Sequence, residues 1–213
     1  MDIRDRTPSL THLRDFTRAR STSRQTHVAR DYAQVAESAE SQFFAFYYEK
    51  FITSAIEYIA NGSMGGALDR CVEDAPVTKK ASYAAAARGL TSILGTVPIM
   101  SAKRQQNTMT ARDDNNQGLV SLRTHLILEL EDGSRVAAHM HFSGSKLVPA
   151  EQAILETAVA LAVSQNGQGL IPALMLVRPG LLQLIDTNEA LTQDRLIFLE
   201  EESAAYRDEW LSM

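Results

Sequence analysis

The segment Gly118–Phe142 has the sequence GLVSLRTHLILELEDGSRVAAHMHF, in which apolar and polar residues alternate on both sides of a break at 131–133. Alternation with a period of two is typical of β-strands. A short break that contains glycine, placed between two such runs, indicates a β-hairpin. The segment therefore predicts two antiparallel strands that are neighbours in the fold.

The register of this hairpin follows from its loop. A three-residue loop pairs Leu130 with Ser134, and Gly133 takes the left-handed conformation that such loops need. The next pair, Glu129 opposite Arg135, is a favourable cross-strand charge pair. A slip by one residue would turn the apolar set of one strand into water, so burial selects this register. The residues that it directs to the core are Leu122, Leu126, Leu128, Val136, Ala138, Met140 and Phe142.

The opposite side of the hairpin then carries Arg123 and three of the five histidines of the chain, His125, His139 and His141. His125 falls opposite His139, and Arg123 falls opposite His141. This face has three interpretations: a polar surface that meets water or a protein partner, a surface for an anion or a phosphate backbone, and a zinc site. Three histidines would leave a zinc ion one open position, where a bound water becomes acidic. Because Arg123 would repel a dication, the sequence favours a partner or an anion over a metal.

The composition limits the class of protein. With 213 residues and a net charge of −5, the chain has the size of one domain and no general affinity for nucleic acid. Cys71 is the single cysteine, so no disulfide forms within the chain, which fits a cytoplasmic location. No run of 18 or more apolar residues occurs, so we expect no membrane span. Neither a nucleotide-binding loop nor a serine-hydrolase elbow is present, so we expect no cofactor and no clear enzyme activity.

The charge is unevenly distributed. Residues 1–30 hold seven arginines and three aspartates, about +4, which leaves about −9 for the rest. Their few apolar residues cannot bury enough surface to fold alone, so we predict a basic arm over 1–27 and one domain over 28–213. That domain would have a helical part, 28–98, and a part with the sheet, 99–213. The arm is a candidate contact for a polyanion or a neighbouring copy through Arg4, Arg6, Arg14, Arg18, Arg20 and Arg24.

A long helix is predicted from about Val28 to Ala60, ended by Asn61-Gly62. Its second half is apolar nearly all round, which is typical of a helix in the centre of a core or at an interface. We interpret it mainly as the central core helix, with an interface to a partner as the alternative. The candidate interface residues are Phe43, Phe44, Tyr47, Tyr48 and Phe51.

Further elements complete an α+β fold. Helices are predicted at about 79–94 and 149–165, and buried strands at 170–177 and 181–185. We therefore expect an antiparallel sheet of about four or five strands that packs against the long aromatic-rich helix and two or three further helices.

The leading functional hypothesis is a non-catalytic assembly or adaptor protein. It would self-associate as a homo-oligomer or dock a protein partner, with the arm as its contact. One alternative is a nucleic-acid-binding component of a larger complex. The other is a zinc-dependent hydrolase or lyase that uses His125, His139 and His141.

Overall fold

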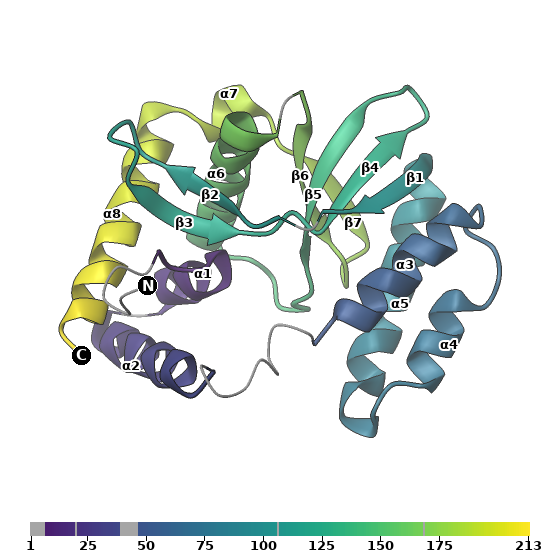
Figure 1. Ribbon diagram of the computed structural model, residues 1–213, viewed down its shortest axis with the longest axis horizontal. Coiled ribbons are helices and arrows are strands. Elements are labelled where there is room, and N and C mark those ends of the chain that lie inside the picture. The colour runs from purple at the N-terminus through teal and green to yellow at the C-terminus, as the bar shows by residue number, and fades with distance from the viewer. Residues whose placement is uncertain (1–6, 20, 39–46, 106, 168) are drawn as a thin grey trace.

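The computed structural model describes residues 7–19, 21–38, 47–105, 107–167 and 169–213 (Figure 1). Its strands are β1 (Ile99–Arg104), β2 (Met109–Arg112), β3 (Gly118–Leu122), β4 (Leu126–Leu130), β5 (Arg135–His141), β6 (Ile171–Leu176) and β7 (Leu181–Leu184). The helices of the described part are α1 (Leu10–Arg18), α2 (Ser21–Ser38), α3 (Glu49–Ala60), α4 (Ala67–Glu73), α5 (Val77–Thr96), α6 (Pro149–Asn166), α7 (Thr187–Ala190) and α8 (Gln193–Leu211).

Five strands form the main sheet, in the order β1-β4-β5-β6-β7, and β2 and β3 form a separate two-stranded sheet. The α+β class and the five strands agree with the prediction from the sequence. The sheet is mixed rather than fully antiparallel, because β5 and β6 run parallel. Parallel neighbours need a crossover connection, and α6 supplies it between β5 and β6.

The predicted hairpin is confirmed as β4–β5. Glu129 pairs with Arg135, and the Leu130 N–H donates to the Ser134 carbonyl at 2.9 Å. Gly133 has a φ of 81°, as the three-residue loop requires. The prediction of one continuous strand from residue 118 is wrong, since β3 ends at Leu122 and pairs with β2 in the smaller sheet.

Helices cover both faces of the main sheet. Figure 1 shows α3, α4 and α5 gathered on one side, and α1, α2, α6 and α8 on the other. The first group packs on the predicted apolar face, which includes Leu126, Leu128 and Val136. The second group packs on the face of Ala137 and Leu174. The predicted solvated histidine face is therefore largely covered.

The first helix lies in the core, which differs from the predicted basic arm. Leu10, Leu13 and Phe16 are at most 2 % exposed and belong to the same buried cluster as α6 and α8. Their spacing places them on one side of α1, where the body of the protein buries them. The described part of 1–27 thus folds onto its own chain.

The predicted single helix over 28–60 is wrong. Tyr47 and Tyr48 form a turn, and α3 begins only at Glu49. Residues 39–46, which include the candidate interface residues Phe43 and Phe44, lie outside the described residues. The predicted helices at 79–94 and 149–165 correspond to α5 and α6, and the strands predicted at 170–177 and 181–185 correspond to β6 and β7. The prediction that the second strand is buried is wrong, because β7 is an edge strand whose Leu181 and Leu184 are about half exposed. None of the described helices has the length and apolarity that a membrane span needs.

A close backbone contact between α5 and the β6–β7 turn gives a first prediction. A Cβ on Gly89 would overlap the carbonyl oxygen of Val177, so Gly89→Ala must force the two segments apart. We expect a loss of about 3 kcal/mol or more in the free energy of unfolding, measured by urea denaturation. Gly95→Ala is the matched control on the same helix. A Cβ at this position meets nothing within 4 Å, so Gly95→Ala should raise the free energy of unfolding by about 0.5–1 kcal/mol. Equal effects of the two changes would contradict this packing.

The buried face of α1 gives a second prediction. Phe16 is fully buried and contacts the Tyr206 ring edge-on, with the ring centroids 5.4 Å apart. Phe16→Ala should therefore lower the free energy of unfolding by about 3–5 kcal/mol. Thr11→Ala, an exposed position on the same helix, should change it by less than about 0.5 kcal/mol. If Phe16→Ala left urea denaturation unchanged, α1 would behave as a detached arm.

Candidate functional site

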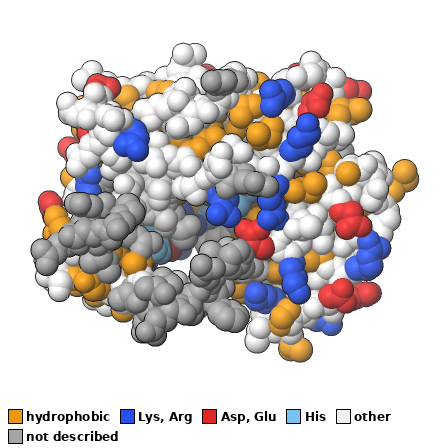
Figure 2. All heavy atoms as spheres, in the orientation of Figure 1, with side chains coloured by type: hydrophobic (Ala, Val, Ile, Leu, Met, Phe, Trp, Pro, Cys, Tyr) orange, Lys and Arg blue, Asp and Glu red, His pale blue; other side chains and the backbone are white. Residues whose placement is uncertain are grey.

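A cleft of about 830 Å³ opens at the carboxyl ends of the parallel strands β5 and β6. Ligands commonly bind at this edge of sheets with parallel strands, and the volume is that of a small-molecule site. Its walls come from the first turn of α1, the start of α3, the segment 121–125 and the residues that follow β5 and β6. Figure 2 shows pale-blue histidine side chains beside blue and red ones in a hollow near the centre of this face.

The three histidines of the hairpin all line this cleft. His139 and His141 lie two apart on β5 and are only 8 % and 4 % exposed. His125 lies just before β4, and its ring centroid is 5.1 Å from that of His139. The structure therefore brings the three together as the sequence predicted, but in a cleft instead of on an open sheet face.

The fold fixes the tautomers of these histidines. The Nδ1–H of His139 donates to the Arg123 carbonyl at 2.8 Å, which leaves Nε2 with a lone pair. His125 is the reverse case, because its Nδ1 accepts from the Met140 backbone N–H at 3.0 Å. The Nδ1 of His141 accepts from the Arg14 guanidinium at 3.2 Å, since an arginine can only donate. Neutral His125 and His141 thus carry their proton on Nε2.

Burial keeps the three rings neutral. It lowers the pKa of His139 to about 4. The hydrogen bond to the Arg123 carbonyl partly opposes this shift, and the charge of Arg14 adds a smaller lowering. Burial also lowers the pKa of His141 to about 4, again assisted by Arg14 and by His139. The pKa of His125 falls well below its usual value because of burial and then the neighbouring His139. At pH 7 all three therefore act as hydrogen-bonding groups without charge.

Three arginines supply positive charge to the cleft. Arg14 on α1 is held by its neighbour Asp15 and reaches His141. Arg123 contacts Glu49 at the start of α3, at 3.2 Å. Arg178, in the turn after β6, donates to the Tyr48 hydroxyl at 3.1 Å and has no carboxylate partner among the described residues.

The acidic side chains at the cleft wall are too few to balance its positive charge. Glu49 is its one acidic side chain among the described residues, and both Arg104 and Arg123 share it. The first turn of α1 also faces the cleft and contains no acidic residue. Because a helix N-terminus carries partial positive charge, the start of α1 adds to the positive charge of the cleft wall.

Two donors at the cleft wall are buried without an acceptor. They are the Nε2 of His141 and the Nε of Arg178, neither of which has a hydrogen-bond partner in the described part of the chain. Buried donors are normally paired, since an unpaired one costs about 1–3 kcal/mol. An acceptor supplied from outside the described chain would remove this cost.

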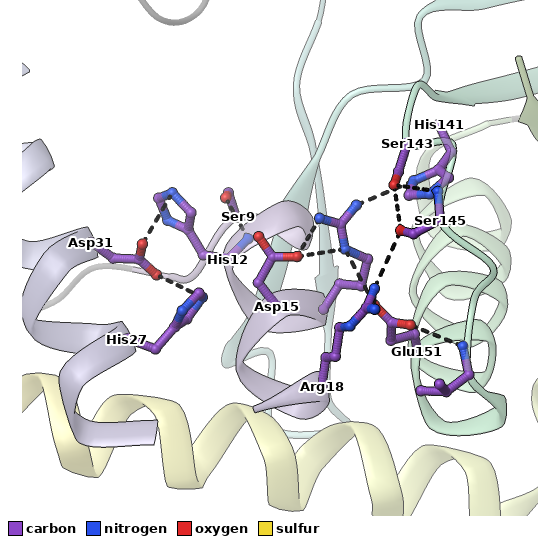
Figure 3. A network of polar contacts seen from close by, with 12 residues as sticks. Ser9, His12, Asp15, Arg18, His27, Asp31, His141, Ser143, Ser145 and Glu151 are labelled. Carbon is purple, nitrogen blue, oxygen red and sulfur yellow. Dashed lines mark hydrogen bonds and ion pairs between the residues drawn. The ribbon is translucent and has the colours of Figure 1, made fainter. Parts of the chain in front are cut away.

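The described arginines of the predicted arm bind acidic groups of their own chain. Arg18 lies 3.5 Å from the Glu151 carboxylate and donates to the Ser145 hydroxyl at 3.3 Å (Figure 3). Arg24 donates twice to Glu202, at 2.8 and 2.9 Å. These pairs leave Arg18 and Arg24 outside the cleft and occupied by the body of the protein. Arg4, Arg6 and Arg20 lie outside the described residues.

The aromatic candidates for a partner interface pack within their own chain. Phe51 is fully buried, so it offers no surface to a partner. Tyr48 stacks on Phe142 with ring centroids 3.7 Å apart, and Tyr47 packs edge-on against Tyr48. Tyr47 and Tyr48 thus form part of the wall of the cleft, and their assignment to an interface stays a prediction.

A metal centre finds no support in the geometry. Among the residues that the structure describes, no group of three or more His, Cys, Asp or Glu side chains is placed to hold an ion. The Nδ1 atoms of His125, His139 and His141 are all engaged in the hydrogen bonds described above. The other two histidines, His12 and His27, lie 4.0 and 3.9 Å from the buried Asp31 in a separate cluster (Figure 3).

Sequence reasoning missed Arg178 and Glu49, and it assigned Arg14 to an arm. Arg178 directly follows an apolar run that was correctly predicted as a strand. Had the parallel pairing of that strand been recognised, the position after its carboxyl end would have been a candidate site. No comparable signal marks Arg14, which reaches the cleft only through the packing of α1.

Comparison with known proteins gives no family. No protein-family model matches the chain, and no curated protein is significantly similar to it.

The buried histidines predict a dependence of stability on pH. In the unfolded chain a histidine has a pKa of about 6.5, whereas His139 and His141 titrate at about 4 when folded. Between these values the unfolded chain binds more protons, so the free energy of unfolding falls as the pH falls. At about pH 5 we expect each histidine to account for a loss of about 2 kcal/mol relative to pH 7.

Urea denaturation at the two pH values measures this loss. The carboxylates of the protein also titrate, so the control is His139→Asn, which keeps a donor for the Arg123 carbonyl but does not titrate. It should show a smaller loss than the wild type. Identical pH dependences would contradict a buried, neutral His139.

Proposed function

We propose that this chain is a binding protein for a small oxyanion, which it takes up in the cleft at the ends of β5 and β6. One observation carries the proposal. Arginine and histidine side chains from α1, β5 and the turn after β6 converge on one small-molecule-sized cleft, and two of their N–H groups are buried without an acceptor.

The chemistry of the wall matches an anion. Arg14 is paired with Asp15, and Arg104 and Arg123 share the single carboxylate of Glu49. The surplus positive charge therefore comes from Arg178 and from the second arginine on Glu49. Hydrogen bonds from a guanidinium to an anionic oxygen are short and about twice as strong as neutral ones. The histidines add donors without adding charge, so the cleft can surround the ligand without bringing many cations together.

The size of the cleft favours a small anion over the nucleic-acid alternative. A nucleic-acid backbone is bound by basic side chains that follow it over an extended surface. Arg18 and Arg24, which would extend such a surface along α1 and α2, are paired with Glu151 and Glu202. The remaining cations face a cleft of about 830 Å³, which suits a small ligand.

An assembly or adaptor role has weaker support than anion binding. It was suggested by the basic arm and by the aromatic residues near Tyr47, and the described members of both sets pack on their own chain. Anion binding instead uses Arg178, which has no carboxylate partner among the described residues, and the unpaired Nε2–H of His141.

Arg178 provides the test. Isothermal titration calorimetry with inorganic phosphate, at pH 7 and low salt, should detect one site per chain. Arg178→Met removes the donor that has no carboxylate partner, and it should weaken binding by about 10- to 100-fold.

The matched control is Arg135→Met, at the opposite end of the same sheet, where β5 begins. It should leave the phosphate affinity within about twofold. Absence of binding by phosphate, pyrophosphate and succinate would overturn the proposal, as would an Arg178→Met variant that binds phosphate as the wild type does.

A further inference from the structure

Among the charged and imidazole side chains of the cleft, one acceptor atom is left without a donor. The Glu49 carboxylate also accepts, but its two oxygens already take hydrogen bonds from Arg104 and Arg123. Arg14, Arg123 and Arg178 can only donate. The free Nε2 atoms of neutral His125 and His141 also donate, because their Nδ1 atoms accept from Met140 and Arg14. The exception is His139.

His139 is held in the opposite tautomer by the backbone. Its Nδ1–H donates to the Arg123 carbonyl at 2.8 Å, so its Nε2 presents a lone pair. The described residues give that Nε2 no hydrogen-bond partner, and the side chain lines the cleft. A carbonyl can only accept, so this tautomer is imposed by the fold and does not depend on the ligand.

A ligand that fills the cleft must therefore match this pattern. It needs several acceptor oxygens for the arginines and for His125 and His141, and one O–H group for the Nε2 of His139. Sulfate and phosphodiesters offer acceptors alone, so one of their oxygens would face the lone pair of His139. A phosphate with a protonated oxygen offers both kinds of group.

From this pattern we infer, as an extension that rests on the proposed function, that the cleft selects phosphate in a form that carries a P–O–H group. Hydrogen phosphate fits directly. A phosphate monoester fits as its monoanion, since its second proton is lost at a pKa of about 6. His139 acts as the specificity-determining acceptor, whereas Arg14 and Arg178 bind any oxyanion.

The rejection of sulfate follows from desolvation. An acceptor that is removed from water and faces another acceptor loses its hydrogen bonds and gains a repulsion. Sites that are built around a substrate O–H or N–H group discriminate strongly against analogues that lack it. We therefore expect inorganic phosphate to bind at least about tenfold more tightly than sulfate.

His139→Asn tests the role of the acceptor. The Asn amide can still donate to the Arg123 carbonyl, but it does not reach the position of the Nε2 atom. Calorimetric titrations with phosphate and with sulfate, at pH 7, should show that the preference for phosphate falls to within about twofold. Phosphate affinity should fall while sulfate affinity changes little. Arg178→Met, in contrast, should weaken both anions by similar factors.

A second measurement begins with the wild type. Near pH 8 inorganic phosphate is mainly HPO₄²⁻, which keeps one O–H group, so it should bind without net uptake of a proton. Titrations in two buffers of different ionisation enthalpy measure that uptake. Uptake of about one proton by the wild type that disappears in His139→Asn would mean that His139 becomes protonated and donates, and it would overturn the inference.

The outcomes distinguish this inference from the proposed function. If neither anion binds the wild type, both fail. If phosphate and sulfate bind equally well, and Arg178→Met weakens both, the anion site stands and the selection by His139 is wrong. Glycerol 3-phosphate in place of inorganic phosphate shows whether the site also accepts a monoester, which should then take up a proton at about pH 8.

Discussion

The parallel pairing of β5 with β6 is the constraint on which the rest of the structure depends. It requires α6 to cross one face of the sheet, and that helix covers the face on which His139 and His141 lie. The same pairing brings the carboxyl ends of two strands together at one edge. The burial of the histidines and the position of the cleft are thus two results of one topological choice.

The hairpin could be predicted from the sequence because its information is local. A period of two, a glycine in the loop and the Glu129–Arg135 pair together fix the register within a few residues of the turn. The covering of the histidine face could not be predicted in this way. It depends on α6 and α1, which are distant in the sequence, and strands in an antiparallel sheet commonly have one face in water.

The errors near the N-terminus have a related cause. Leu10, Leu13 and Phe16 are too few to make a stable helix by themselves, and the arginines and serines around them have the composition of a disordered segment. Their burial by α6 and α8 stabilises α1, and tertiary packing is not visible in a short window of sequence. Near Tyr47 the opposite error occurred, because an apolar aromatic run suggested a continuous helix where the chain makes a turn.

The two buried donors at the cleft wall, on His141 and Arg178, set stability against function. Apolar groups of similar shape in place of both members of a pair, His141 with Arg14 or Arg178 with Tyr48, would remove the unpaired donor without leaving another, and such paired replacements are commonly neutral or stabilising. Selection for thermostability alone would therefore replace these polar side chains of the cleft early. The hairpin and the buried clusters on the two faces of the sheet would remain unchanged. Retention of the polar residues at these positions in an evolving population would then indicate that selection acts on binding.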